Sequence, residues 1–186
     1  MKRKHFKISL ATALFASALA YAQATPAPLK AATEDSAAIA EKKRLAAEEK
    51  AKLPKPYHPE ENAEKKIGEL IKKAKAENKN IILQAGGNWC IWCLRFNNFV
   101  QTTPELKEMV DKDFIYYHLN YSPENKNEKV FARYGNPCAK FGYPVFIVLD
   151  SNGKMIHTQE SSVLEEGKGY SIDKVKAFFT AWKPQK

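Results

Sequence analysis

Two cysteines three positions apart, Cys90 and Cys93, constrain this chain more than any other feature of its sequence. They follow the apolar run Ile81–Leu83, which is typical of a buried strand, and they open a segment with helical periodicity. A pair of thiols at such a strand-to-helix junction can form and break a disulfide within one helical turn. The spacing therefore predicts redox chemistry at sulfur.

The two sulfurs are expected to have different roles. A cysteine reacts as its thiolate, and the unpaired backbone N–H groups at a helix N-terminus stabilise that anion. Cys90 holds this position, so we expect its pKa to lie below that of a free cysteine. Cys93, one turn further on, is placed to attack the mixed disulfide that Cys90 forms with a substrate. Cys90 is the predicted nucleophile and Cys93 the predicted resolving thiol.

The first 24 residues have the pattern of an export signal. Basic residues precede an apolar stretch over residues 8–20, and small residues follow it. We expect a signal peptide over residues 1–24, cleavage after Ala24, and a mature protein that is periplasmic or secreted. The apolar stretch is shorter than the ~20 residues of a membrane span, so no stable span is expected after cleavage.

The formal net charge of +9 overstates how basic the mature protein is. Four basic residues and no acidic ones lie in the signal, so cleavage lowers the charge to +5. The remaining basic residues alternate with acidic ones and form no stripe with interleaved aromatic side chains. We therefore expect a mixed-charge surface and no nucleic-acid partner.

The mature chain divides into a spacer and one folded domain. Residues 25–56 consist mostly of Ala, Glu and Lys, with too few bulky apolar residues to build a core. We interpret them as a low-complexity linker in which residues 36–52 favour a helix. Residues 57–186 are long enough for one ordinary hydrophobic core and form the predicted domain.

Hydrophobic periodicity predicts an α/β fold for this domain. The expected helices cover residues 60–78, 90–100, 104–110 and 172–182, with a helical turn at 130–134. Thr103 is the expected cap of the third of these helices, and Ser171 is the expected cap of the fourth. The expected strands cover residues 80–85, 114–119, 145–149 and 154–158. The helical crossover between the first two strands favours parallel pairing, and Asn152-Gly153 predicts a hairpin between the last two.

The segment Trp89-Cys90-Ile91-Trp92-Cys93, with Gly142-Tyr143-Pro144 and an apolar strand some fifty residues later, resembles the thioredoxin-like fold family. The likeness covers about residues 63–182 and is greatest to exported bacterial thioredoxin-like proteins and to the thioredoxin-like domains of disulfide reductases and isomerases. It implies a three-layer α/β fold, in which helices flank a central mixed β-sheet. It also implies a cis Pro144 beside the cysteine pair and a Tyr143 backbone that hydrogen-bonds a substrate strand.

Three departures from the thioredoxin pattern limit what can be carried over. Ile91-Trp92 stands where thioredoxins have Gly-Pro, so the redox potential cannot be transferred. Gln84 stands where thioredoxins have a buried Asp that helps to move the proton of the resolving thiol. Glutamine cannot accept that proton, so water or another group has to. Residues 136–141 look like an insertion before the Pro144 segment.

Several side chains near the cysteines have two interpretations. Cys138, in the apparent insertion, is either a third thiol that traps or relays a disulfide or a small buried apolar residue. Trp89 and Trp92 either form an apolar platform for substrates, with Trp92 exposed between the cysteines, or pack in the ordinary way. His118 and His157 lie in expected strands and are interpreted as structural histidines with satisfied hydrogen bonds.

The predicted function is an exported thiol–disulfide oxidoreductase that reduces or isomerises disulfides in other proteins. Its expected partners are disulfide-containing proteins and a membrane or soluble redox partner, and its direction stays open. We expect no cofactor, because the cysteines carry the electrons. We also expect no metal, because no further Cys or His lies at a zinc-ligand spacing. The alternative is a non-catalytic binding module with the thioredoxin fold.

Overall fold

The computed structural model describes residues 29–185, so the expected signal peptide over residues 1–24 lies outside the described residues. The chain divides into two compact units, Met1–Ile39 and Ala40–Lys186. Helix α1 covers Leu29–Lys52, where the sequence predicted a helix over residues 36–52. In the second unit, α1 exposes Leu45, as expected of a segment with few core-forming residues.

A four-stranded mixed sheet forms the centre of the second unit, in the order β2-β1-β3-β4. Its strands are β1 (Asn80–Gly86), β2 (Phe114–Asn120), β3 (Val145–Leu149) and β4 (Met155–Glu160). Strand β1 pairs in parallel with β2, as the helical crossover predicted, and in antiparallel fashion with β3. The predicted thioredoxin-like α/β fold is therefore confirmed.

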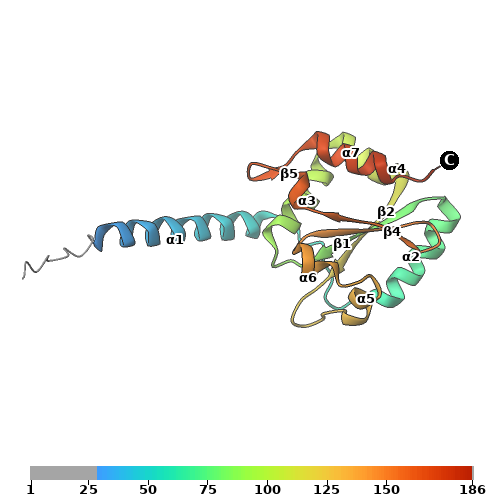
Figure 1. Cartoon of the computed structure of the whole chain (residues 1–186), viewed down its shortest axis with the longest axis horizontal. Helices are drawn as coiled ribbons and strands as arrows, with labels where there is room; N and C mark the ends of the chain where they lie inside the picture. Colours follow the sequence, from blue (N-terminus) through green and yellow to red (C-terminus); the bar gives the residue numbers. More distant parts are fainter. Residues whose placement is uncertain (1–28, 186) are drawn as a thin grey trace, which may run out of the picture. The chain divides into compact units, whose positions relative to one another are not determined.

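Helices cover both faces of this sheet (Figure 1). One layer consists of α3 (Ile91–Thr102), α4 (Pro104–Asp113) and α7 (Ile172–Trp182). The other consists of α2 (Ala63–Glu77), α5 (Glu128–Arg133) and α6 (Pro137–Phe141). Each layer encloses an apolar core against its own face of the sheet.

Strand β1 decides what lies beneath the cysteines. Successive side chains on a strand point to opposite faces, so Ile81 and Leu83 enter the core under α2, and Ile82 enters the core under α3. Gln84, two positions after Ile82, points to the α3 face and is fully buried at 0% exposure. The alternation therefore places a polar amide in the core directly below the helix that carries the cysteines.

The helix ends agree only in part with the predicted caps. The Asn62 side chain caps α2 by accepting a hydrogen bond from the Lys65 backbone N–H at 3.0 Å. Thr103 and Ser171 precede α4 and α7 as predicted, but their side chains make no capping hydrogen bond. Both residues are nevertheless the N-cap residues that the sequence predicted, and each helix begins directly after its cap.

Two short features were not predicted from the sequence. Helix α6 occupies most of the apparent insertion before Pro144 and packs Cys138 and Phe141 against the core under α2. A turn of 3-10 helix (Ser162–Leu164) and the hairpin of β5 (Glu165–Glu166) and β6 (Gly169–Tyr170) connect β4 to α7. Within residues 29–185, the structure contains no helix that is long and apolar enough to cross a membrane.

Candidate active site

Cys90 and Cys93 are joined by a disulfide, with their Cα atoms 5.3 Å apart. Cys90 is the N-cap residue of α3, and its Sγ accepts a hydrogen bond from the Cys93 backbone N–H at 3.2 Å. Once the disulfide is reduced, this N–H and the helix dipole favour a thiolate at Cys90. Cys90 keeps 7% of its surface exposed and Cys93 none, so an incoming group reaches Cys90 first.

Beneath the disulfide, three polar side chains form a buried hydrogen-bonded chain. Gln84 Nε2 donates to the Tyr57 hydroxyl at 2.7 Å and to the Cys93 backbone oxygen at 2.9 Å. The Tyr116 hydroxyl donates to Gln84 Oε1 at 2.7 Å. The glutamine that replaces the acid of thioredoxins therefore has partners for both N–H groups and for its oxygen, which explains how it tolerates burial.

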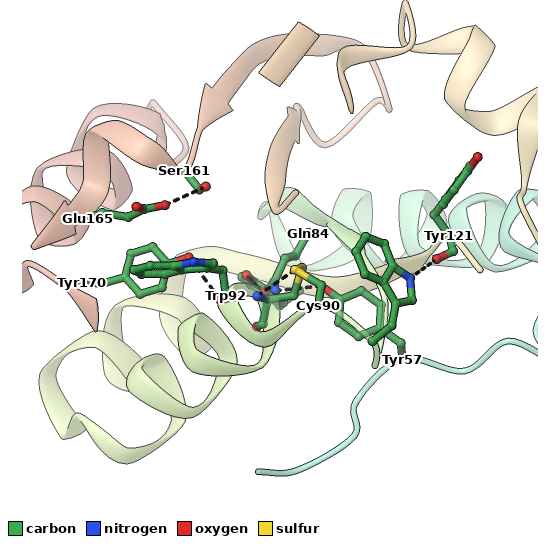
Figure 2. The surroundings of a disulfide bond; sticks show 11 residues. Tyr57, Gln84, Cys90, Trp92, Tyr121, Ser161, Glu165 and Tyr170 are labelled. Atoms are coloured by element: carbon green, nitrogen blue, oxygen red, sulfur yellow. Dashed lines mark hydrogen bonds between the residues drawn. A yellow bond between two sulfur atoms is a disulfide. The ribbon is translucent and has the colours of Figure 1, made fainter. Parts of the chain in front are cut away.

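Tyr57 reaches this site from the segment before α2. The Asn88 side chain fixes its backbone, accepting from the Tyr57 N–H at 3.2 Å and donating to the Tyr57 carbonyl at 2.8 Å. The Tyr57 ring lies in a buried cluster with Cys90 and Cys93, and Figure 2 shows it beside Cys90 on the side opposite Trp92. Sequence reasoning missed this residue, because an aromatic residue between Pro56 and Pro59 gives no signal of such a role.

A group of aromatic side chains forms the surface on the Tyr57 side of Cys90. Trp89 is 46% exposed, and its indole N–H donates to the Tyr121 carbonyl at 2.7 Å. The Trp89 and Tyr143 rings meet edge to face at 5.2 Å, and the Tyr143–Pro144 peptide bond is cis, as the resemblance implied. An open, apolar pocket of about 470 Å³ lies between Trp89, Tyr121 and Pro123. An extended chain can therefore meet an apolar surface next to Cys90.

Trp92 is half-buried, so the expectation that it stands exposed between the cysteines was wrong. Its ring meets Tyr170 edge to face at 5.7 Å, and the Arg95 guanidinium lies over it at 4.9 Å. Arg95 in turn forms a two-pronged ion pair with Glu49 of α1, at 2.8 and 2.6 Å. The hairpin that delivers Tyr170 covers this indole, which the local sequence around Trp92 does not indicate.

His118 does not have the satisfied hydrogen bonds that the sequence interpretation gave it. Its Nε2 is buried and has no hydrogen-bond partner among the described residues. Burial, with a smaller effect from His58, lowers the pKa of His118 to about 4. His118 is therefore neutral near pH 7. Its ring packs edge to face against the Tyr57 ring, with the ring centroids 5.1 Å apart.

Cys138 is the third thiol and is partly buried next to Tyr143. Burial raises the pKa of Cys138 to about 11, although a hydrogen bond from the Tyr143 hydroxyl acts in the opposite direction. Only about 10⁻⁴ of this thiol is ionised at pH 7, whereas exchange needs the thiolate. This favours the interpretation of Cys138 as a small packing residue.

After reduction, we expect alkylation of Cys138 by iodoacetamide to be far slower at pH 7 than alkylation of Cys90. Because its pKa is raised, the Cys138 rate should increase about tenfold with each pH unit until the pH approaches 11. Mass spectrometry of the digested protein measures both rates. A Cys138 rate that equals the Cys90 rate at pH 7, or that levels off below pH 9, would contradict this expectation.

The described residues, 29–185, contain no cluster of three or more Cys, His, Asp or Glu side chains suited to a metal ion. The groups that converge on the cysteine pair are instead backbone N–H, amide, hydroxyl and aromatic groups. The arrangement is suited to chemistry at the two sulfurs themselves.

The fold and the cysteine pair define the class of this protein. Residues 62–151, just under half of the chain, match the family model described as thioredoxin-like, and the fold of this domain is thioredoxin-like. No curated protein matches the chain at a significant level.

Solved structures are similar to this chain at low sequence identity. The disulphide isomerase from Xylella fastidiosa Temecula1 is 22% identical, with a TM-score of 0.61 over 69% of this chain and 97% of its own. The oxidised C-terminal domain of DsbD from Neisseria meningitidis is 18% identical, with a TM-score of 0.46 over 66% of this chain and 97% of its own. A DsbH oxidoreductase is 21% identical, with a TM-score of 0.45 over 62% of this chain and 80% of its own.

Proposed function

We propose that this protein is a thiol–disulfide oxidoreductase that reduces or isomerises disulfide bonds in other proteins. One observation carries the proposal: Cys90 and Cys93 form a disulfide at the N-terminus of α3, where a backbone N–H is aimed at the Cys90 sulfur. The thioredoxin-like fold supports it, as does the cis Pro144 that follows Tyr143. Cys90 is the proposed nucleophile and Cys93 the proposed resolving thiol.

In the reducing direction the reaction has two exchanges. The Cys90 thiolate attacks a sulfur of the substrate disulfide, so that a mixed disulfide forms and the other substrate sulfur leaves as a thiolate that takes up a proton. The Cys93 thiol then loses its proton and attacks Cys90 Sγ. The Cys90–Cys93 bond forms, and the second substrate sulfur leaves with the electron pair and is protonated. Two electrons have then passed from the protein to the substrate.

Isomerisation uses the same first exchange and a different ending. If another substrate thiolate attacks the mixed disulfide before Cys93 does, Cys90 is released as a thiolate and the substrate keeps a rearranged disulfide. The relative speed of the Cys93 attack therefore decides between the two outcomes. Cys93 is buried and shielded from solvent, so it is suited to attack the neighbouring Cys90 sulfur and not an external disulfide.

The substrate surface is proposed to consist of Trp89, Trp92, Tyr143 and Pro144. Trp89 and Tyr143 present ring surface beside Cys90, and such amphipathic rings bind apolar segments of a polypeptide. Trp92, whose side chain is half-buried, contributes the part of its surface that stays exposed. A disulfide-containing protein with an apolar segment next to its cysteine is the substrate that this surface fits.

The proposed location is the periplasm or the outside of the cell, where such a protein meets disulfide-containing substrates. The basic and apolar pattern of residues 1–24 supports this location. We propose the division into a signal over residues 1–24, a linker over 25–56 and a thioredoxin-like domain over 57–186. A membrane or soluble redox partner would restore the reduced Cys90–Cys93 pair after each turnover.

Reduction of insulin by dithiothreitol tests the activity. We expect the wild-type protein to accelerate the reaction and Cys90→Ser to reduce the acceleration to background, because serine supplies no thiolate at neutral pH. Cys138→Ser is the matched control and should retain the wild-type rate within about twofold, since its thiol is un-ionised at neutral pH. Equal rates for wild type and Cys90→Ser would favour the non-catalytic binding module instead.

A further inference from the structure

Cys93 has to lose a proton before it can attack the mixed disulfide, yet the side chain that thioredoxins use for this step is absent. Its place is taken by Gln84, which cannot accept a proton. Cys93 is fully buried, and burial alone disfavours a thiolate there. Some other group near Cys93 therefore has to compensate for the loss of solvent around the developing charge.

The hydrogen-bond directions beneath the disulfide are fixed by elimination. The Cys93 backbone oxygen can only accept, so the Gln84 atom 2.9 Å from it is the amide nitrogen, a donor. The same nitrogen lies 2.7 Å from the Tyr57 hydroxyl oxygen, which is therefore an acceptor in that bond. The hydroxyl hydrogen of Tyr57 is left free for another partner.

That partner is indicated by the position of Gly86. A Cβ atom built on Gly86 would lie 2.5 Å from Cys93 Sγ and 2.8 Å from the Tyr57 hydroxyl oxygen, so both atoms border the same small space. Tyr57 and Cys93 also belong to one buried cluster. Among the described residues no hydrogen bond joins Tyr57 to Cys93 in this disulfide form, in which the sulfur carries no charge.

We propose that the Tyr57 hydroxyl donates a hydrogen bond to the sulfur of reduced Cys93 as it becomes a thiolate, and thereby assists the resolving step. This role rests on the proposed function and assigns a partner to its second exchange. The proton of Cys93 itself leaves for the departing substrate sulfur or for water. Tyr57 stays protonated throughout, because burial raises the pKa of Tyr57 well above its usual value and makes it a donor and not a base.

The other titratable groups around Tyr57 and Cys93 leave Tyr57 as the donor. They are Tyr116 and His118 from β2, Tyr143 before β3, Cys138 from α6 and Tyr170 from β6. Burial raises the pKa of each tyrosine and of Cys138 and lowers that of His118, so all five are neutral near pH 7. The Tyr116 hydroxyl already donates a hydrogen bond to Gln84 Oε1, and the Tyr170 hydroxyl donates one to the Trp92 carbonyl.

Tyr57→Phe tests this proposal in a protein whose remaining thiol is Cys93, made with Cys90→Ser and Cys138→Ser. NMR of isotopically labelled cysteine reports the pKa of Cys93 directly and needs no substrate. We expect Tyr57→Phe to raise the pKa of Cys93 by about one unit, the size of a lost hydrogen bond to a charged group. Tyr170→Phe is the control: it removes a buried hydroxyl that donates to the Trp92 backbone oxygen. It should shift the pKa of Cys93 by less than about 0.3 units.

The two-cysteine protein supplies a second measurement. In Tyr57→Phe the release of a small thiol from its mixed disulfide with Cys90 should slow about three- to fourfold at pH 7. The tenfold smaller thiolate fraction is partly offset by the higher nucleophilicity of a more basic sulfur. The rate at which Cys90 is first alkylated should stay within about twofold, since Tyr57 acts on the other sulfur.

An unchanged Cys93 pKa in Tyr57→Phe would overturn the proposal, as would an equal shift in Tyr170→Phe. If Tyr57→Phe does not fold, Asn88→Ala replaces it, because loss of the backbone contacts to Tyr57 should raise the same pKa by a smaller amount. The outcome is separable from that of the proposed function. A wild-type protein that fails to reduce insulin contradicts the function, whereas the NMR result depends only on the two side chains.

Discussion

We expect Cys93→Ser to accumulate a covalent complex between Cys90 and its substrate. The first exchange needs only Cys90, whose sulfur faces the Cys93 backbone N–H and keeps some exposure to solvent. The second exchange needs a thiolate at position 93, and a serine hydroxyl does not ionise at neutral pH. An attack within one protein has a large advantage over attack by external thiols, so the complex should last at least about 10³-fold longer than in the wild type.

Mass spectrometry and non-reducing electrophoresis with oxidised insulin measure this complex. Cys90→Ser is the matched control: it retains Cys93, whose sulfur has no exposed surface, and it should form no adduct. The complex should dissociate when dithiothreitol is added, because the bond is a disulfide. Adducts that form in Cys90→Ser but not in Cys93→Ser would show that the two roles are reversed.

The sequence predicted the elements that carry the site, since each had a strong local signal. The run that became β3 is apolar throughout and fully buried, and the Asn152-Gly153 turn after it places Gly153 at a positive φ that favours glycine. The helix predicted from position 90 begins at Ile91, with Cys90 as its N-cap. The chemistry at the two sulfurs depends on this strand-to-helix junction. Because the junction has a strong local signal, the chemistry could be predicted from the sequence.

The parts that were missed depend on contacts between distant segments. Tyr57 reaches Gln84 only because Asn88 holds its backbone, and nothing in the sequence around Tyr57 indicates that contact. Trp92 is half-buried because Tyr170 arrives from a hairpin with two-residue strands, too short for a periodic signal. Helix α6 has five residues, which is also below the length at which helical periodicity is visible.

We expect Gly86→Ala to destabilise the protein, because Gly86 borders the small space between Tyr57 and Cys93. The added Cβ would lie 2.5 Å from Cys93 Sγ and 2.8 Å from the Tyr57 hydroxyl oxygen, and both residues are buried. Neither atom is the free end of a mobile side chain, because the Cys93 sulfur belongs to the disulfide and the Tyr57 hydroxyl accepts a hydrogen bond from Gln84. We expect this overpacking to lower the free energy of unfolding by about 1–3 kcal/mol.

Gly68→Ala provides the opposite case with the same chemical change. Gly68 is exposed within α2, and a Cβ there would meet nothing within 4 Å. Alanine is the better helix former, so this variant should gain about 0.5–1 kcal/mol. Urea denaturation of the three oxidised proteins measures both changes. The opposite signs matter more than the sizes: if Gly86→Ala were as stable as Gly68→Ala, Tyr57 and Cys93 would not enclose a space too small for a methyl group, and the contact on which the resolving step depends would be absent.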